Sequence, residues 1–251
     1  MTKYILFDTE TTGNAEEDRI IQLGGMIVSG KSDIECYDEL CSSDVEIKLE
    51  AMEVHNITPD MLLGKPKCIE TNFYNKLLEH NNPNNYLIAH NIKFDMGMIE
   101  KEGFENQYTI IDTLRAARHL LDDLPYHRLQ YLRYALDLYM TEEDEANKLG
   151  IVIKAHDAIG DVLVMKLLLS ELVKLAKAKH PEEKNPMVTL ANLTAQPVLV
   201  KKFRFGKYKG KYINEVASED PGYLNWMRTS MEDMDEDLKY TIDKVLQGAS
   251  I

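Results

Sequence analysis

Two carboxylates follow an uncharged run of β-forming residues close to the start of the chain. Residues 4–7, Tyr-Ile-Leu-Phe, have the composition of a buried strand, and Asp8 and Glu10 come just after it. Because side chains alternate along a strand, the two acids share one face and Thr9 points to the other. Neighbouring acids on a buried strand repel each other and lose hydration, so a positive group is expected between them. Hard cations such as Mg²⁺ and Mn²⁺ bind carboxylate oxygens, and the pair therefore predicts a divalent metal site.

An isolated Asp-x-Glu sequence is also typical of a strand end that frays into a polar turn, here through residues 11–13. Three downstream segments make the metal site the stronger interpretation. They are residues 50–58 (Glu-Ala-Met-Glu-Val-His-Asn-Ile-Thr), residues 91–95 (Asn-Ile-Lys-Phe-Asp) and residues 156–161 (His-Asp-Ala-Ile-Gly-Asp). Apolar positions at helical spacing predict a helix from about residue 158 to residue 180, with Asp161 in its early turns.

In this order, the four segments resemble the three exonuclease motifs and the substrate-contact segment of the DEDDh 3′–5′ exonucleases. The resemblance implies an α/β fold with an RNase H-like mixed five-stranded sheet flanked by helices. It also implies that Asp8, Glu10, Asp95 and Asp161 hold two Mg²⁺ or Mn²⁺ ions. His156 would then be the general base, because a histidine that titrates near neutrality can take a proton from metal-bound water.

The same resemblance implies a set of substrate contacts around the 3′-terminal nucleotide. Taken alone, His55 is more often a packed histidine at a helix end, and Asp95 is an ordinary acid in the first turn of a helix. Asn56 stands where the family usually has glycine, and asparagine is the best substitute if that backbone is left-handed. The implied contact residues are Thr9, Thr11, His55, Ile57, Asn91 and Phe94, with Phe94 stacking on the terminal base or sugar.

The remaining pattern predicts the elements that build such a sheet. Asp112 is assigned a supporting role near the sheet, and residues 141–155 are expected to be polar and then extended. The predicted strands cover residues 4–7, 20–28, 34–40, 86–89 and 109–112, and the predicted helices cover residues 69–80, 94–101, 113–121, 129–136 and 158–180.

The chain is divided into an exonuclease domain over residues 1–180, a linker over residues 181–196 and a small α+β module over residues 197–251. The linker is predicted because the helical pattern stops and proline recurs. Residues 201–212 interleave cations with aromatic residues and contain no acid. With Asp-Pro-Gly-Tyr-Leu-x-Trp at residues 220–226, they resemble the C-terminal tail of exodeoxyribonuclease X-type enzymes. The resemblance makes Lys207, Lys209 and Lys211 DNA-contact candidates, and a packing or dimerisation module is the alternative.

Composition limits the setting in which the chain works. The formal net charge of −13 predicts weak non-specific affinity for nucleic acid, although it allows a local basic patch. Three cysteines without Cys-x-x-Cys spacing disfavour a disulfide framework or a zinc site. Strand sequence from residue 4 leaves no room for a signal peptide, and no apolar run is long enough to span a membrane. We therefore expect a cytoplasmic protein without membrane contact, and no protein partner is evident.

The resulting hypothesis is a metal-dependent 3′–5′ exonuclease that releases nucleoside 5′-monophosphates from the 3′ ends of single-stranded or duplex DNA, in DNA repair. RNA is a possible substrate, because an exoribonuclease or oligoribonuclease would use the same catalytic residues. A polymerase-bound proofreading subunit would need a different tail. A non-catalytic nucleic-acid-binding protein is disfavoured, because no metal or base position has been lost.

Overall fold

The computed structural model describes residues 1–30, 33–153 and 157–249. Its central feature is a five-stranded sheet in the order β3-β2-β1-β4-β5. The strands β1, β2 and β3 are antiparallel, whereas β4 and β5 run parallel to β1, so the sheet is mixed and the predicted RNase H-like architecture is confirmed. The strands are β1 (Tyr4–Thr11), β2 (Ile20–Val28), β3 (Ile34–Leu40), β4 (Tyr86–Ala89) and β5 (Thr109–Asp112).

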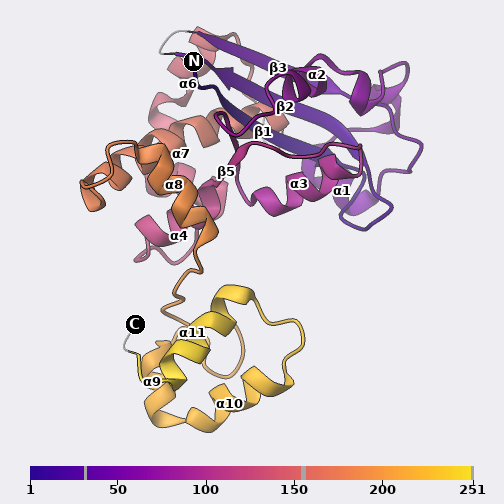
Figure 1. Cartoon of the computed structure of the whole chain (residues 1–251). Coiled ribbons are helices and arrows are strands. Elements are labelled where there is room, and N and C mark those ends of the chain that lie inside the picture. The colour runs from indigo at the N-terminus through magenta and orange to yellow at the C-terminus, as the bar shows by residue number, and fades with distance from the viewer. Residues whose placement is uncertain (31–32, 154–156, 250–251) are drawn as a thin grey trace.

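Helices cover both faces of this sheet, and a separate helical group follows at the C-terminus (Figure 1). Two short 3₁₀ helices, Pro59–Leu62 and Cys68–Glu70, lie between α1 and α2. The α-helices are α1 (Leu49–His55), α2 (Asn72–Glu79), α3 (Ile92–Glu100), α4 (Thr113–Leu120), α5 (Leu129–Ala135), α6 (Tyr139–Leu149), α7 (Ala158–Lys179), α8 (Pro186–Ala195), α9 (Ile213–Glu219), α10 (Pro221–Ser230) and α11 (Glu236–Leu246). In the described residues no helix is long and apolar enough to cross a membrane.

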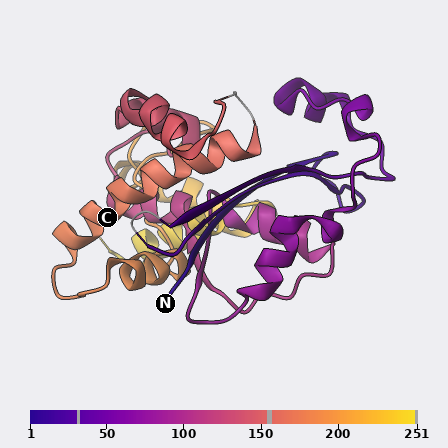
Figure 2. The same cartoon turned by 90° about the horizontal axis from the view of Figure 1, so that it is seen from above.

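The two faces of the sheet bury different helices, as the view in Figure 2 shows. One apolar cluster joins Leu6 of β1 to side chains of α4, α5, α7 and α8. The other joins Ile5 and Phe7 of the same strand to α2, α3 and the segment that follows α3. The alternation of side chains along β1 therefore decides which helix each residue faces.

Two adjacent glycines in β2 let helices approach the sheet closely. A Cβ on Gly24 would lie 2.4 Å from the carbonyl carbon of Ala158, at the start of α7. A Cβ on Gly25 would lie 2.2 Å from the ring of Phe73 in α2. Because Gly24 is paired with Asp8 in the sheet, the start of α7 is held directly beside the first carboxylate of β1.

Helix α6 forms over Tyr139–Leu149, within the stretch of residues 141–155 that we predicted to be polar and then extended, and no helix was predicted there. Two positions of this polar helix are buried. Glu142 is 2% exposed and accepts a hydrogen bond from Arg133, and Ala146 is also buried. Gly150, with φ of 70°, ends the helix in the left-handed conformation that favours glycine.

Helix α8 occupies most of the range predicted as a linker. The Asn185 side chain caps it by accepting a hydrogen bond from the Met187 N–H, and Pro186 takes the first helical position. Met187, Leu190 and Leu193 are buried in the cluster that contains α7. Residues 186–195 therefore pack as part of the exonuclease core, and the proline that suggested a linker begins a helix.

The C-terminal part is helical, whereas an α+β module was predicted. Its β structure in the described residues is one isolated bridge, between Lys202 and Tyr212. The helices α9, α10 and α11 enclose a small apolar core of their own. Its buried members are Phe203, Ile213, Val216, Leu224, Met227, Leu238, Ile242 and Val245.

One buried acid joins this C-terminal part to the exonuclease core. Asp237, in the first turn of α11, is 2% exposed. It forms ion pairs with Arg115 at 3.2 Å and with Arg118 at 3.0 Å, both from α4. It also accepts a hydrogen bond of 2.9 Å from the Val198 N–H, so the connecting segment is held at the same point.

Replacing Gly24 with alanine tests whether the close approach of α7 to β2 matters. The added methyl group meets backbone atoms that cannot turn aside, so we expect Gly24→Ala to lower the free energy of unfolding by about 1–3 kcal/mol. Gly97→Ala in α3 is the matched control, because a Cβ there meets nothing within 4 Å and alanine favours a helix by about 1 kcal/mol. Urea unfolding of both variants measures the difference, and equal stability of Gly24→Ala and wild type would contradict the argument.

Candidate active site

Strand β1 directs Asp8 and Glu10 toward α7 and Thr9 toward α3. The two acids continue the phase of Leu6, which packs against α7, whereas Thr9 continues the phase of Phe7 on the opposite face. Asp8 and Glu10 are half-buried, and Thr9 is buried. The predicted placement of both acids on one face of a strand is therefore present in the structure.

Asp161 lies in the first turn of α7. Gln130 of α5 donates a hydrogen bond of 2.7 Å to Oδ1 of Asp161. The start of the same helix is held by Gln22 of β2, whose amide nitrogen donates to Asp157 at 2.8 Å and to Asp38 at 2.7 Å. Two glutamines therefore orient the acids of α7, and the sequence pattern singled out neither of them.

Asp95 reaches the site from α3 on the other side of the sheet. It is 3% exposed, and its Oδ1 accepts hydrogen bonds from the backbone N–H and the hydroxyl of Thr9, at 3.1 Å and 2.8 Å. Asn91 begins this helix with φ of 70°, and its N–H donates to Asp112 at 3.0 Å. Asp112 also caps α4 by accepting from the Leu114 N–H, which agrees with the supporting role predicted for it.

The four acids lie close enough to shift one another's protonation. Burial is the largest cause that raises the pKa of Asp8, followed by the charges of Asp95, Asp161 and Glu10. Burial, then Asp161 and Asp95, raises the pKa of Glu10 to about 8. Burial raises the pKa of Asp95 to about 7, against the opposing effect of its hydrogen bonds from Thr9. Asp8, Glu10, Asp95 and Asp161 therefore form one electrostatic site.

The chemistry of this donor set fits hard divalent cations, because all four groups offer carboxylate oxygens. As the side chains lie, no three acidic, histidine or cysteine groups in the described parts of the chain are arranged to hold one ion. One oxygen of Asp95 is engaged by Thr9, and one of Asp161 by Gln130. Metal binding would therefore require these side chains to turn toward each other.

His156, the predicted general base, lies outside the described residues. The described chain ends at Ile153 on one side of it and resumes at Asp157 on the other. Its role in proton transfer stays a prediction.

His55 is buried and uses both ring nitrogens within the protein. Its Nδ1 accepts a hydrogen bond of 2.9 Å from the Ile57 N–H, and its Nε2 lies 3.2 Å from the carbonyl oxygen of Thr11. Nδ1 is the acceptor, so Nε2 carries the proton and donates to Thr11. Asn56 between them has φ of 60°, a left-handed backbone in which asparagine is the best substitute for glycine. This segment holds the end of β1 in place, and contact of His55 or Ile57 with a nucleotide stays a prediction.

Phe94 and Asn91 differ from His55 in being accessible. Phe94 is 37% exposed in the first turn of α3, one residue before Asp95. Asn91 is exposed at the start of the same helix. Both side chains therefore lie outside the core and close in sequence to the predicted metal ligand Asp95. A residue that contacts substrate has to be accessible in this way.

The predicted DNA-contact lysines lie in the C-terminal part, in a loop before α9. Lys207 pairs with Asp220 at 3.0 Å, and Lys211 pairs with Glu219 at 2.8 Å. Lys209 is exposed in the same loop. Exposed ion pairs of this kind contribute little to stability, so they leave the lysines able to bind other anions. Their role as DNA contacts stays a prediction.

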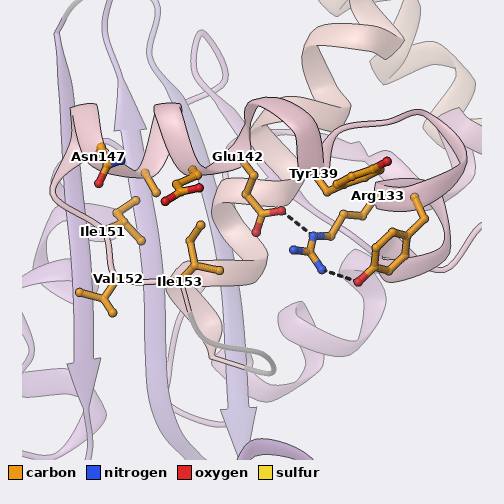
Figure 3. A pocket seen from close by; sticks show the side chains of 10 residues that line it. Arg133, Tyr139, Glu142, Asn147, Ile151, Val152 and Ile153 are labelled. Atoms are coloured by element: carbon orange, nitrogen blue, oxygen red, sulfur yellow. Dashed lines mark hydrogen bonds and ion pairs between the residues drawn. The ribbon is translucent and has the colours of Figure 1, made fainter.

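A cavity of about 540 Å³ lies between α6 and the segment that leads toward residue 154 (Figure 3). Arg133, in its wall, is held by Glu142 at 2.5 Å and by the Tyr134 hydroxyl at 3.0 Å. Val152 is 71% exposed at its edge. Glu142 and Glu143 in the lining repel a phosphate, and Arg133 is already paired with Glu142.

The fold and the four converging carboxylates define a nuclease of the RNase H-like class. A family model described as "Exonuclease" matches residues 5–169, and the chain belongs to this exonuclease family. A second model, described as "Exodeoxyribonuclease X-like C-terminal", matches residues 203–228. The predicted resemblance to 3′–5′ exonucleases is thereby confirmed.

Individual relatives agree with this assignment. The chain is 26% identical to exodeoxyribonuclease 10 of Escherichia coli K12 over 247 residues, which cover 97% of this chain and 98% of that protein. It is 34% identical to the PolC-type DNA polymerase III of Bacillus cereus over 170 residues, or 65% of this chain and 11% of that protein. The structure of exonuclease X in complex with 5′ overhanging duplex DNA has the same fold, with a TM-score of 0.52 and 20% identity, over 76% of this chain and 99% of that chain.

The raised pKa values predict how the metal-free protein responds to pH. The pKa of Glu10 rises from an ordinary 4.5 to about 8, so between these values the folded state binds more protons than the unfolded state. The free energy of unfolding in EDTA should therefore fall as pH increases from 4.5 to 8, by up to about 1.4 kcal/mol per pH unit for each such group. Urea titrations across this range measure the slope.

Glu10→Gln removes one of the repelling charges, so this variant should show a shallower slope and exceed wild type in stability at pH 8 without metal. Glu53→Gln on α1 is the control, because Glu53 is exposed and is not among the charges that raise the pKa values of Asp8 and Glu10. A wild-type protein as stable at pH 8 as at pH 5, or equal slopes for both variants, would show that the four acids do not repel one another as described.

Proposed function

We propose that the chain is a metal-dependent 3′–5′ exodeoxyribonuclease that releases nucleoside 5′-monophosphates. The observation that carries this proposal is the meeting of four acids, from β1, α3 and α7, in which the charges of Asp95 and Asp161 raise the pKa values of Asp8 and Glu10. Family membership supports exonuclease chemistry. The match to exodeoxyribonuclease 10, which extends over nearly the whole of both chains, supports DNA as the substrate.

The acids Asp8, Glu10, Asp95 and Asp161 would hold two Mg²⁺ or Mn²⁺ ions. Bound divalent ions lower the pKa of a water molecule and neutralise charge on the phosphodiester. Thr9 keeps one Asp95 oxygen oriented through two hydrogen bonds. The remaining oxygen is left for ligation, and the fixed side chain loses little freedom on binding.

The proton released by the attacking water would pass to His156. Such positioned proton transfer contributes roughly 10²–10⁴-fold to a rate. Asp157, the next residue, is anchored to Gln22 of β2 at 2.8 Å, so the chain beyond His156 is held at the sheet. This anchoring supports the proposal that His156 acts at the same edge of the sheet as the four acids.

The terminal nucleotide would be recognised at the end of β1 and the start of α3. Thr11, fixed through its carbonyl by His55, would offer its backbone N–H to the 3′-hydroxyl group. Phe94, at 37% exposure, would stack on the base or sugar. Recognition of a free 3′-hydroxyl explains why such an enzyme acts from chain ends.

We place the catalytic domain at residues 1–196 and a separate C-terminal module at residues 197–249. This moves the predicted boundary, because α8 packs with α7 in the exonuclease core. The three cysteines, Cys36, Cys41 and Cys68, are free in the structure. Free thiols suit a reducing compartment, so we propose that the enzyme is cytoplasmic. We also propose that it acts in DNA repair.

Matched DNA and RNA oligonucleotides test the proposed function. Each carries a 5′-fluorophore and the same sequence, and products are resolved on gels with Mg²⁺, with Mn²⁺ and with EDTA. We expect stepwise shortening of DNA from the 3′ end, no shortening in EDTA, and much slower loss of RNA. Faster degradation of RNA would make the protein an exoribonuclease, and full activity in EDTA would exclude the metal mechanism.

Individual acids are tested by replacing a carboxylate with an amide of the same shape. We expect Asp95→Asn and Asp161→Asn each to abolish DNA shortening, because each removes a charged ligand from a site that needs several. Both variants should be at least as stable as wild type in EDTA, since a repelling charge is lost. Asp60→Asn, in the exposed 3₁₀ turn, is the control. Near-normal activity in either site variant would remove that residue from the metal site.

A further inference from the structure

A cavity of about 500 Å³ lies where the exonuclease core meets the C-terminal part. Three arginines line it, and they come from distant segments of the chain. Arg118 is in α4, Arg128 precedes α5, and Arg204 belongs to the C-terminal part. In a protein with a formal net charge of −13, three cations facing one cavity form a distinct positive site.

The arginines of this cleft are incompletely neutralised. Arg118 pairs through one nitrogen with Asp237 at 3.0 Å, but its Nε is buried without a hydrogen-bond partner. Arg128 and Arg204 are exposed, and neither forms an ion pair with any acid in the described parts of the chain. Arg128 lies over the ring of Tyr126, with 5.4 Å between the guanidinium carbon and the ring centroid.

A second buried polar atom in the cleft has no partner. His127 is 4% exposed, and its Nε2 donates to the Leu121 carbonyl oxygen at 2.9 Å. Its Nδ1 is therefore left as an acceptor, and it has no hydrogen bond. Buried polar atoms are nearly always hydrogen-bonded. The Arg118 Nε is a donor and suits an anion, whereas the His127 Nδ1 is an acceptor and suits a donor such as bound water.

The charges of the cleft also act on each other. Arg204 is exposed as a residue, but partial desolvation of its guanidinium group, and then the charge of Arg118, lower its pKa, against the opposing effect of Asp235. Burial lowers the pKa of His90 to about 4, and Arg118 adds to that effect. Cations that destabilise one another in this way are stabilised by an anion placed between them.

The cleft borders the candidate active site through two segments of the chain. Asn91 lines it and begins α3, the helix of Asp95. Arg128 also lines it, two residues before Gln130, whose amide holds Asp161. A strand whose 3′ end lies at the acids could therefore continue into the cleft.

We propose that this cleft binds a backbone phosphate of the nucleic-acid substrate beyond its terminal nucleotide, and that Arg204 of the C-terminal module completes it. The proposal rests on the proposed function for the identity of the ligand. Guanidinium groups bind phosphate oxygens through paired hydrogen bonds, and Arg118, Arg128 and Arg204 supply three of them. Tyr126, at 48% exposure, offers a ring on which a base can stack.

The contacts of Asp237 position the C-terminal module, and with it Arg204, at this cleft. The acid binds Arg115 and Arg118 of α4 and the backbone of Val198, so the segment from residue 198 starts at a fixed point beside α4. Arg204 follows six residues later. Lys207 and Lys211 of the next loop pair with acids of the module, whereas Arg204 lines the cleft together with residues of the catalytic domain.

Salt-dependent DNA binding tests the proposal. Fluorescence anisotropy of a 5′-labelled single-stranded 3′-end oligonucleotide is measured in EDTA, so that no cleavage occurs, over a range of salt concentrations. Each lost phosphate contact should lower the slope of log K against log salt by about 0.7. Because one phosphate is bound, we expect a smaller slope and weaker binding for Arg204→Ala, a slope lowered by at most about 0.7 in total for Arg128→Ala with Arg204→Ala, and a wild-type slope for Arg204→Lys.

Arg228→Ala is the matched control, because it removes an exposed arginine of the same module outside the cleft. Thermal melting checks that each variant is folded, and Arg204 is exposed, so its replacement should not disturb the core. Equal slopes for Arg204→Ala and Arg228→Ala would overturn the proposal even if wild type shortens DNA in Mg²⁺. A reduced slope for Arg204→Ala in a protein that shortens no DNA would instead support the cleft and exclude the proposed function.

Discussion

The mutual repulsion of four partly or fully buried carboxylates is the interaction on which the rest of this structure depends. The charges of Asp95 and Asp161 raise the pKa values of Asp8 and Glu10, so the fold must supply the energy that keeps the acids together. It does so with rigid elements: β1 spaces Asp8 and Glu10 on one face, and Gly24 lets the first turn of α7 lie against the sheet. Such a site gains stability when divalent cations bind, which couples its folding to its chemistry.

Hydrogen bonds from uncharged side chains complete this arrangement. Thr9 holds Asp95 and Gln130 holds Asp161, each through a single carboxylate oxygen. Neutral donors orient an acid without cancelling its charge, so the attraction for a cation is preserved. A lysine or arginine in the same place would have formed an ion pair and competed with the metal.

The C-terminal module is held in place by another buried acid, which lies outside the candidate active site. Asp237 is a buried acid that is satisfied by two arginines and one backbone N–H, and such a network holds a domain interface in one geometry. It leaves part of Arg118 unpaired at the cleft, beside Arg204. An acidic protein thereby concentrates positive charge at the one boundary where a substrate strand would pass.

Local sequence determined much of this protein. The uncharged run before Asp8 and the helical spacing after Asp157 were readable from neighbouring residues, because strand alternation and helix period are local properties. The polar segment that forms α6 and the proline-rich segment that forms α8 were misjudged, since burial of Glu142 against Arg133 and of Leu190 against α7 depends on distant partners. Only the tertiary structure brought Gln130 to Asp161 and Arg204 to Arg118, because contacts between residues far apart in the chain exist only once the elements have packed.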